Sequence, residues 1–293
     1  MRILISGVDG FVGRHFKRVL NTPDNEVVGF DIKSGVDALD VFQANDGPFD
    51  LVLHCAAVVG GRAKIEGQPM DIAVDLAIDA LMFQWALRTR PGRIVYFSSS
   101  AAYPTRLQGP VHHRALAEPD IDLDDVDQPD AVYGWVKLTG EMLARHARAE
   151  GLDVTVVRPF SGYGPDQDLT YPFPSFIDRA VRRADPFEVW GDGHQVRDWV
   201  HIDDVVGATL ALVEAGVDGP VNLATGVGTS MDELAALAMA AAGHDAPVEH
   251  HLDAPVGVAH RVGDPAGMLR WFTPRWTVEA GVADAVDRAR MAA

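Results

Sequence analysis

Short apolar runs alternate with helical patterns along the N-terminal part of the chain, and this alternation restricts the fold more than any other feature. The runs, rich in β-branched residues, cover positions 3–5, 27–30, 51–53, 93–97 and 154–157. Continuous apolar runs are typical of strands covered on both faces, as in a parallel sheet. Between them, apolar residues recur with the three- and four-residue spacing of buried helical faces. The pattern predicts an α/β fold, a Rossmann-like doubly wound parallel sheet of right-handed βαβ units.

The first apolar run leads directly into a glycine-rich turn that opens a helix. Gly7, Gly10 and Gly13 would permit a tight turn and let the backbone approach a pyrophosphate, which the free amides of the helix N-terminus would bind. Asp31 ends the second run, at about the distance expected of a carboxylate that accepts a hydrogen bond from a ribose 2′-hydroxyl. Because this carboxylate would repel a 2′-phosphate, the sequence favours NAD over NADP as cofactor.

Two further segments are expected near this cofactor. Asp37 lies where a third strand would end, so its carboxylate could meet the adenine amino group, or it could belong to a solvated turn. Cys55, Ala56 and Ala57 follow the run 51–53, and their small side chains would let the backbone press against the cofactor. For Cys55 the alternative is a small, unreactive core residue.

A phenol and an ammonium stand four residues apart, at Tyr133 and Lys137, and therefore on one face of a predicted helix. A free phenol has a pKa near 10, but a neighbouring ammonium stabilises the phenolate and enables proton exchange with a sugar hydroxyl or ketone. Ser98, Ser99 and Ser100 follow the run 93–97 at the carboxyl edge of the sheet, where doubly wound folds bind ligands. The alternatives are an ordinary surface helix and ordinary strand-end serines.

The chain resembles the extended short-chain dehydrogenase/reductases, and within them the nucleotide-sugar epimerases, dehydratases and ketoreductases. The resemblance extends over nearly the whole chain and rests on six motifs in order, at 7–13, 54–57, 98–104, 133–137, 158–165 and 190–198. It implies a catalytic set of Ser99, Tyr133 and Lys137. It also implies homodimers formed through helices over about 71–88 and 133–149.

The glycine-rich turn and the resemblance together give the expected binding residues. Cofactor contacts are expected at Gly7, Gly10, Phe11, Val12, Gly13, Asp31, Asp37, Ala38, Cys55, Ala56, Ala57, Ser98, Tyr133, Lys137 and Pro159. Contacts to a nucleoside-diphosphate sugar are implied at Ser99, Ser100, Tyr133, Trp190, Arg197 and Arg261, with Arg197 on the diphosphate and Arg261 as the second basic contact.

Glycines and prolines crowd the segment after Pro159 and mark the start of a second lobe. A helix over about 203–214 and a strand at 221–223 are expected to return to the sheet, and Ser230 with Glu233 forms a capping-box pattern. We therefore expect an NAD-binding Rossmann domain over 1–158, to which about 196–228 returns. Residues 159–293 would form mainly a smaller C-terminal substrate-binding lobe.

Departures from the family pattern narrow the chemistry. Dehydratases and decarboxylases carry an acidic residue just after the catalytic hydroxyl, whereas this chain has Ser100 and Ala101, which disfavours elimination. The motifs look most like the GDP-mannose 3,5-epimerase and GDP-fucose synthase branch, but Ala101 replaces its cysteine. Asp75 and Ser161 stand where many relatives have Asn.

The simplest expectation is an NAD-dependent epimerase that acts at C4 of the sugar through a transient 4-keto form. The alternatives are an NAD(P)H-dependent reductase of 4-keto-deoxysugars and a non-catalytic NAD-binding member of the fold.

Composition excludes several other classes. The formal net charge of −17 and the lack of a basic stripe argue against nucleic-acid binding. We find neither a signal peptide nor a long apolar span, so no membrane association is expected, and the single cysteine favours a reducing, cytoplasmic location. Adjacent histidines such as those at 112–113 and 250–251 lack ligand spacing, so no metal is expected. The acidic segment 120–130 is expected to be a solvated loop.

Overall fold

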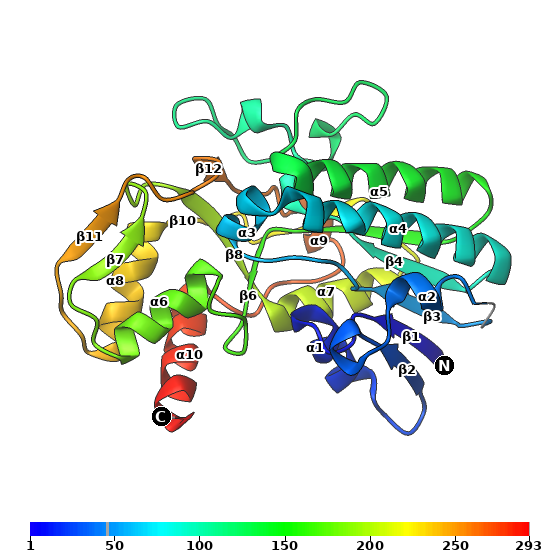
Figure 1. Ribbon diagram of the computed structural model, residues 1–293, viewed down its shortest axis with the longest axis horizontal. Coiled ribbons are helices and arrows are strands. Elements are labelled where there is room, and N and C mark those ends of the chain that lie inside the picture. Colours follow the sequence, from blue (N-terminus) through cyan, green and yellow to red (C-terminus); the bar gives the residue numbers. More distant parts are fainter. Residues whose placement is uncertain (45–46, 293) are drawn as a thin grey trace.

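The computed structural model describes residues 1–44 and 47–292. Within them, six parallel strands form one sheet in the order β2–β1–β3–β4–β5–β9 (Figure 1). These strands are β1 (Arg2–Ser6), β2 (Glu26–Phe30), β3 (Leu51–His54), β4 (Arg93–Phe97), β5 (Val154–Pro159) and β9 (Val221–Leu223). Every predicted apolar run is a strand of this sheet, which confirms the predicted doubly wound α/β fold.

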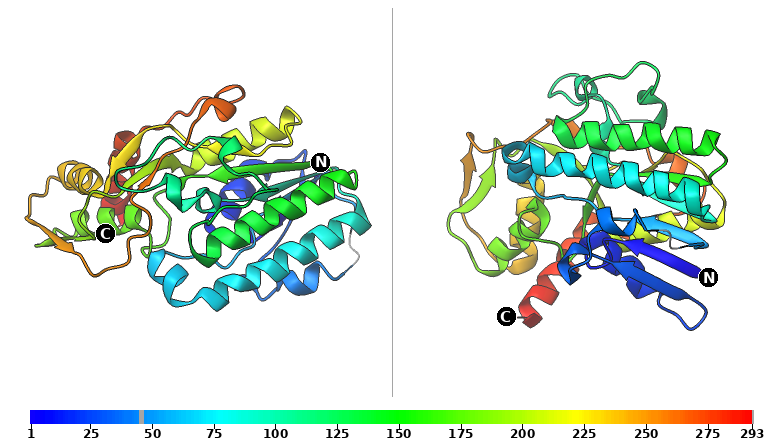
Figure 2. Two further views of the ribbon diagram at one scale, coloured as in Figure 1. Left: turned by 90° about the horizontal axis from the view of Figure 1, so that it is seen from above. Right: turned by 45° about the vertical axis from the view of Figure 1, so that its right-hand side comes forward.

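Helices cover both faces of the sheet (Figures 1 and 2). One face carries α1 (Phe11–Leu20) and α7 (Ile202–Glu214), and the other carries α4 (Pro69–Thr89) and α5 (Ala131–Ala149). Successive strand residues point to opposite faces, so Ile3 and Ile5 join the core beneath α1 and α7 while Leu4 joins the core beneath α4 and α5. This two-sided burial explains why the strands read as continuous apolar runs.

The expected third strand does not form in the described residues between β2 and β3. Asp31 instead accepts a hydrogen bond from the Lys33 amide and begins the 3-10 turn η1 (Ile32–Ser34). Asp37 accepts one from the Leu39 amide and begins the short helix α2 (Ala38–Val41). Each carboxylate satisfies a nearby backbone amide and so favours a turn over an extended strand. The prediction of a strand ending at Asp37 is therefore wrong.

The C-terminal lobe lies on the side toward which the carboxyl ends of the sheet point (Figure 1). A second sheet contains β6 (Ser161–Tyr163), β8 (Val196–His201), β10 (Gly228–Ser230) and β12 (His260–Arg261), and β7 (Phe187–Trp190) pairs with β11 (Val248–His251). These strands and the helices α6 (Pro172–Val181), α8 (Met231–Ala242) and α10 (Val278–Ala292) enclose a separate aromatic-rich core.

The predicted capping box opens α8. Ser230 Oγ accepts a hydrogen bond from the Glu233 amide at 3.1 Å, and the Glu233 carboxylate accepts one from the Ser230 amide at 2.7 Å. The remaining short elements are α3 (Arg62–Gly67), η2 (Ser100–Ala102), η3 (Thr105–Leu107), η4 (Glu118–Asp120) and α9 (Ala266–Leu269). Among the residues described, no helix is long and apolar enough to span a membrane.

Candidate active site

The glycine-rich turn packs against the loop that follows β3. Gly7 has φ +68°, and a Cβ there would lie 2.7 Å from the Ala56 nitrogen; a Cβ on Gly13 would lie 2.1 Å from the Gly7 oxygen. Only glycine fits these two positions. Gly10 is the N-cap of α1 and supplies no side-chain cap, so the first amides of the helix keep their donors free. Free amides at a helix N-terminus fit a pyrophosphate, as the NAD prediction requires.

Asp31 directly follows β2 and lies beside this turn. Its side chain is buried, with Oδ2 accepting a hydrogen bond from the Asp9 amide at 3.0 Å and Oδ1 accepting one from the Lys33 amide at 2.9 Å. Each carboxylate oxygen can accept a second hydrogen bond. A ribose hydroxyl could therefore still bind there, and the role of Asp31 remains a prediction.

Ser99 and Tyr133 lie on two segments that contact each other at the carboxyl edge of the sheet, the start of η2 and the start of α5. Ser99 ends the segment after β4, and its Oγ accepts a hydrogen bond from the Ala101 amide at 3.1 Å. The Asp130 amide donates to the Ala101 oxygen at 2.9 Å, and a Cβ on Gly134 would lie 2.4 Å from that same oxygen. The start of α5 is thus pressed against η2, which brings two of the three predicted catalytic residues to one edge.

Lys137 lies beneath Tyr133, with its Nζ 5.8 Å from the centroid of the Tyr133 ring. The lysine side chain is almost fully buried and, within the described residues, makes no ion pair closer than 4 Å. Burial alone lowers the pKa of this ammonium, but the negative charge of Asp79, together with Tyr133 and Asp75, raises it above its ordinary value. The site therefore holds a protonated lysine under the phenol. We refer to Tyr133, Lys137, Asp75 and Asp79 as the catalytic floor.

The hydroxyl of Ser98 points into a buried ion pair. It donates to Glu141 on α5, and Glu141 in turn accepts two hydrogen bonds from Arg158, at 2.8 and 2.6 Å. Arg158 also donates to the Tyr103 hydroxyl at 3.1 Å. This pair fixes the end of β4 against α5 and takes the one proton of the Ser98 hydroxyl, which leaves the backbone and the lone pairs of the hydroxyl oxygen for the predicted cofactor contact.

Three arginines from separate elements lie near one another: Arg62 on α3, Arg197 on β8 and Arg261 on β12. We call them the arginine wall. Arg62 and Arg261 each donate to the buried Asp130 carboxylate at 2.8 Å. Within the part of the chain that the structure describes, the guanidinium of Arg197 donates only to the carbonyls of Val196, at 2.8 Å, and Val256, at 3.0 Å.

The wall has an excess of positive charge. Among the described residues Arg197 has no carboxylate partner, and burial, with Arg261 and Arg62 nearby, lowers its pKa to about 9. The group still carries its charge at neutral pH. Arg62 also pairs with Glu66, so three guanidinium groups face two carboxylates, and the remaining positive charge suits an anionic ligand such as a diphosphate.

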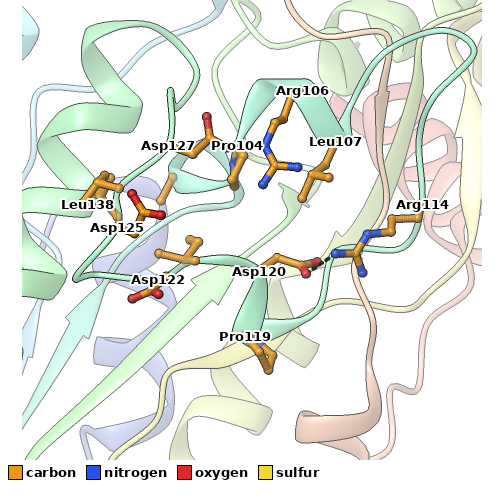
Figure 3. Close-up of a pocket in the computed structure, with 13 residues that line it drawn as sticks. Pro104, Arg106, Leu107, Arg114, Pro119, Asp120, Asp122, Asp125, Asp127 and Leu138 are labelled. Atoms are coloured by element: carbon orange, nitrogen blue, oxygen red, sulfur yellow. Dashed lines mark hydrogen bonds and ion pairs between the residues drawn. The ribbon is translucent and has the colours of Figure 1, made fainter.

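The acidic segment 120–130 differs from the expected solvated loop. Asp120 pairs with Arg114, and Asp130 is buried between two arginines, so only part of the segment is solvated. A cavity of about 420 Å³ lies here, between the loop after β4 and Leu138 on α5. Figure 3 shows the residues that line it. None of the predicted site residues lines it.

The other predicted residues lie on separate elements. Trp190 ends β7 and is 42% exposed, Pro159 ends β5, and Ala38 is buried at the start of α2. Burial raises the pKa of the Cys55 thiol, which leaves it protonated and unreactive at neutral pH. His113 is exposed and stacks on His260, with ring centroids 3.9 Å apart.

Four functional candidates were missed by sequence reasoning: Arg62, Asp130, His54 and Asp79. Asp79 could have been found, because it stands one turn after Asp75 in an otherwise apolar helical face, where an unexplained carboxylate indicates a buried partner. Arg62 and Asp130 gave no such signal, since their pairing joins residues 68 positions apart.

Comparisons with known proteins agree with this geometry. Residues 3–226 match the model of the NAD dependent epimerase/dehydratase family. The chain is 28% identical to a dTDP-4-dehydro-6-deoxy-D-allose reductase of Streptomyces sp, over 91% of this chain and 89% of the relative. It is also 28% identical to GDP-mannose 3,5-epimerase 1 of Oryza sativa subsp. indica, over 90% of this chain and 74% of the relative.

The fold has close counterparts among solved structures. The UDP-glucose 4-epimerase of Thermus thermophilus, in complex with NAD, superimposes with a TM-score of 0.83 over the whole of both chains, at 21% identity. This likeness shows the fold. The family match confirms the predicted cofactor, NAD, and shows that the protein is an enzyme. Because the matched residues make up most of its length, the chain belongs to the NAD-dependent epimerase/dehydratase family.

Proposed function

We propose that the protein is an NAD-dependent epimerase of a nucleoside-diphosphate sugar that inverts C4 through a transient 4-keto sugar. The observation that carries the proposal is the buried ammonium of Lys137 beneath the Tyr133 ring, at the edge where Ser99 ends the segment after β4. A phenol beside a cation is suited to take and return the proton of an alcohol.

Bound NAD would supply the acceptor for the hydrogen on C4 and return it afterwards. Tyr133 takes the proton of the 4-hydroxyl as the carbonyl forms, while Lys137 stabilises the phenolate and Ser99 donates to the carbonyl oxygen. After the 4-keto sugar has rotated in the site, its carbonyl is reduced from the other face. Tyr133 then returns the proton to the oxygen on C4, which gives the opposite epimer. Because the hydride taken from C4 would be returned to C4, no external oxidant or reductant would be consumed.

The arginine wall would hold the diphosphate of the substrate. No carboxylate of the described residues pairs with Arg197, and Arg261 reaches the same region from the neighbouring strand β12, which pairs with β8. The exposed face of Trp190 would pack on the nucleobase, and Ser100 would contact the sugar. These roles place the sugar between the catalytic floor and the wall.

The second candidate is an NAD(P)H-dependent reductase of a 4-keto sugar, which the similarity to the Streptomyces reductase supports. Ala101 removes the cysteine expected for 3,5-epimerisation, so that activity is not proposed.

One experiment separates the candidates. The purified protein is incubated with UDP-glucose, GDP-mannose or dTDP-glucose without added cofactor, and the products are resolved by NMR, with Tyr133→Phe as control. Appearance of a C4 epimer in the parent alone supports the epimerase. Turnover of 4-keto sugars only with stoichiometric NADH or NADPH would replace it with the reductase.

We also propose a cytoplasmic homodimer formed through α4 and α5. Met70, Val74 and Trp135 leave apolar surface exposed on these two helices, at 78%, 42% and 41%. Sedimentation of the parent and of a Val74→Glu/Trp135→Glu variant checks this, since the variant should sediment as a monomer.

A further inference from the structure

Two carboxylates lie fully buried on one face of α4, opposite Lys137 on α5. Asp75 and Asp79 are one helical turn apart, and their side chains are 0% and 1% exposed. Carboxylates are almost never buried to this extent without a partner. Their position therefore calls for a positive charge, and the facing helix supplies one in Lys137, which is itself buried.

Asp79 is held in place by two donors from the sheet. His54 Nε2 donates to Asp79 Oδ1 at 3.0 Å, and the Tyr96 hydroxyl donates to Oδ2 at 2.6 Å. On the other side of the imidazole, His54 Nδ1 lies 2.9 Å from the Ser6 hydroxyl, which accepts a hydrogen bond from the Ala56 amide. The carboxylate is thus fixed by strands β1, β3 and β4, and not by its own helix.

Tyr96 connects this carboxylate to the lysine. Lys137 Nζ lies 5.5 Å from the centroid of the Tyr96 ring, and the hydroxyl of the same ring binds Asp79. The ring reaches this position because residue 140, one turn beyond the lysine on α5, is a glycine. A Cβ on Gly140 would lie 1.8 Å from the Tyr96 hydroxyl. The absence of a side chain at Gly140 therefore leaves room for the Tyr96 hydroxyl that binds Asp79.

We propose that Asp79, held by His54 and Tyr96, is a positioning residue of the catalytic floor: the fixed counter-charge that keeps Lys137 protonated under Tyr133. The inference rests on the proposed function, in which this ammonium stabilises the phenolate. It assigns the charge state of the lysine to a residue that touches neither substrate nor cofactor.

The other charged and titratable groups around the lysine are less suited to this role. They are Asp75 on α4, His54 on β3, Cys55 just after it, Tyr96 on β4, and Tyr133 and Glu141 on α5. Glu141 is neutralised by its bidentate pair with Arg158. Among residues 1–44 and 47–292, Asp75 receives a hydrogen bond only from the Val58 amide, at 2.6 Å, and its Oδ2 has none.

Charge states agree with this choice. Burial raises the pKa of Asp75 to about 6, so it gains a proton in mildly acidic solution. Burial also acts to raise the pKa of Asp79, but Lys137 and His54 outweigh it and lower that pKa below its ordinary value. Asp79 is therefore the carboxylate that stays ionised over the whole working range.

The test measures the lysine directly. The chain has four lysines, at 17, 33, 64 and 137, so protein labelled with carbon-13 lysine gives few Cε signals to titrate by NMR without any ligand. In the parent, the Lys137 midpoint should lie above that of the exposed Lys17. In Asp79→Asn it should fall by at least about one pH unit, a tenfold change in proton affinity. In the matched control Asp71→Asn, an exposed aspartate on the same helix, it should not move.

Two variants guard against a misfolded Asp79→Asn. Tyr96→Phe keeps the carboxylate and removes one donor, so the Lys137 midpoint should fall by less than in Asp79→Asn. If Asp79→Asn alone fails to fold, Asp79→Asn/Lys137→Met should regain cooperative unfolding, because the unpaired buried cation has been removed. A folded Asp79→Asn with an unmoved Lys137 midpoint overturns the inference, and so does failure of the double variant to fold.

Kinetics provide the functional readout. Asp79→Asn should lower kcat at alkaline pH, with the basic limb of the profile moved to lower pH and KM for the nucleotide sugar unchanged. If the NMR midpoint moves but the parent converts no nucleotide sugar, the proposed function fails and the counter-charge stands. If the parent is active and the midpoint does not move, only the counter-charge fails.

Discussion

The catalytic floor and the arginine wall differ in the sign of their unbalanced charge. In the floor, one ammonium, Lys137, faces two carboxylates from α4. In the wall, three guanidinium groups face two carboxylates: Asp130 pairs with Arg62 and Arg261, and Glu66 pairs with Arg62. The floor carries its own counter-charges, so it is complete before a ligand arrives. The wall is short of negative charge, and a diphosphate would supply what it lacks.

The two regions also differ in where their partners come from. The partners in the floor sit on the sheet and its two covering helices, all within the Rossmann part of the fold. The wall draws on α3, β8 and β12, and Asp130, the carboxylate that Arg62 and Arg261 share, lies immediately before α5. The floor and the wall have no residue in common. Variants can therefore perturb the chemical step and the binding of the substrate separately.

The largest effect is expected from breaking the floor. Tyr133→Phe removes the proton carrier, and positioned acid–base groups contribute about 10²- to 10⁴-fold to rate, so kcat should fall by that amount. The wall is untouched, so the affinity for nucleoside diphosphate measured by calorimetry should stay the same. A variant as fast as the parent would refute the assignment of Tyr133.

The next effect is expected from breaking the wall. Arg197→Ala removes the guanidinium that has no carboxylate partner, and a hydrogen bond to a charged group contributes about 1.5–3 kcal/mol. The dissociation constant of a nucleoside diphosphate should therefore rise about 10- to 100-fold, as read by calorimetry. NAD affinity serves as the internal control. Unchanged diphosphate binding would show that the wall has another purpose.

A third variant sharpens the contrast through pH. Two arginines outweigh burial and hold the pKa of Asp130 below its ordinary value, so its ionised form stabilises the fold above about pH 4 and that contribution is lost as pH falls further. Asp130→Asn should lower Tm at neutral pH, and its Tm should decline less than that of the parent between about pH 5 and 3. Parallel declines would contradict the assigned role of the carboxylate.

The smallest effect is expected at Asp75, and it has the opposite sign. Its pKa is raised to about 6 by burial, so the ionised form opposes folding, and this penalty grows as pH rises from about 4 to 6. The Tm of Asp75→Asn should therefore gain a few degrees relative to the parent over this interval and keep the gain above it. Thermal unfolding across the pH series gives the answer, and a constant difference would argue against a titrating Asp75.

Much of the floor could be predicted from sequence because its elements are local. Tyr133 and Lys137 are one turn apart, and Ser99 directly follows an apolar strand, so helix geometry and sheet polarity suffice to bring them to one edge. The strands were equally accessible, since burial on both faces leaves continuous apolar runs. The segment after β2 was misjudged because two aspartates turn the backbone there through local hydrogen bonds.

Only part of the arginine wall could be predicted from the sequence. Arg197 and Arg261 were expected from the family pattern, but the contact of Arg62 with Asp130 depends on how the loop after β3 meets the start of α5. Such long-range pairs leave no periodicity in the sequence. The buried hydrogen bond between Asp79 and His54 was not predicted for the same reason. A carboxylate in an apolar helical face did indicate that some buried partner exists.

Gly140 has a consequence for anyone who wishes to move this charge arrangement into a different protein. An aspartate introduced at the position of Asp79 would not be enough. The Tyr96 hydroxyl that orients it comes from β4, and it fits only because Gly140 on α5 has no side chain. The aspartate, the tyrosine and the glycine would have to be transferred together. A survey of natural sequences should accordingly find that the three change as a unit.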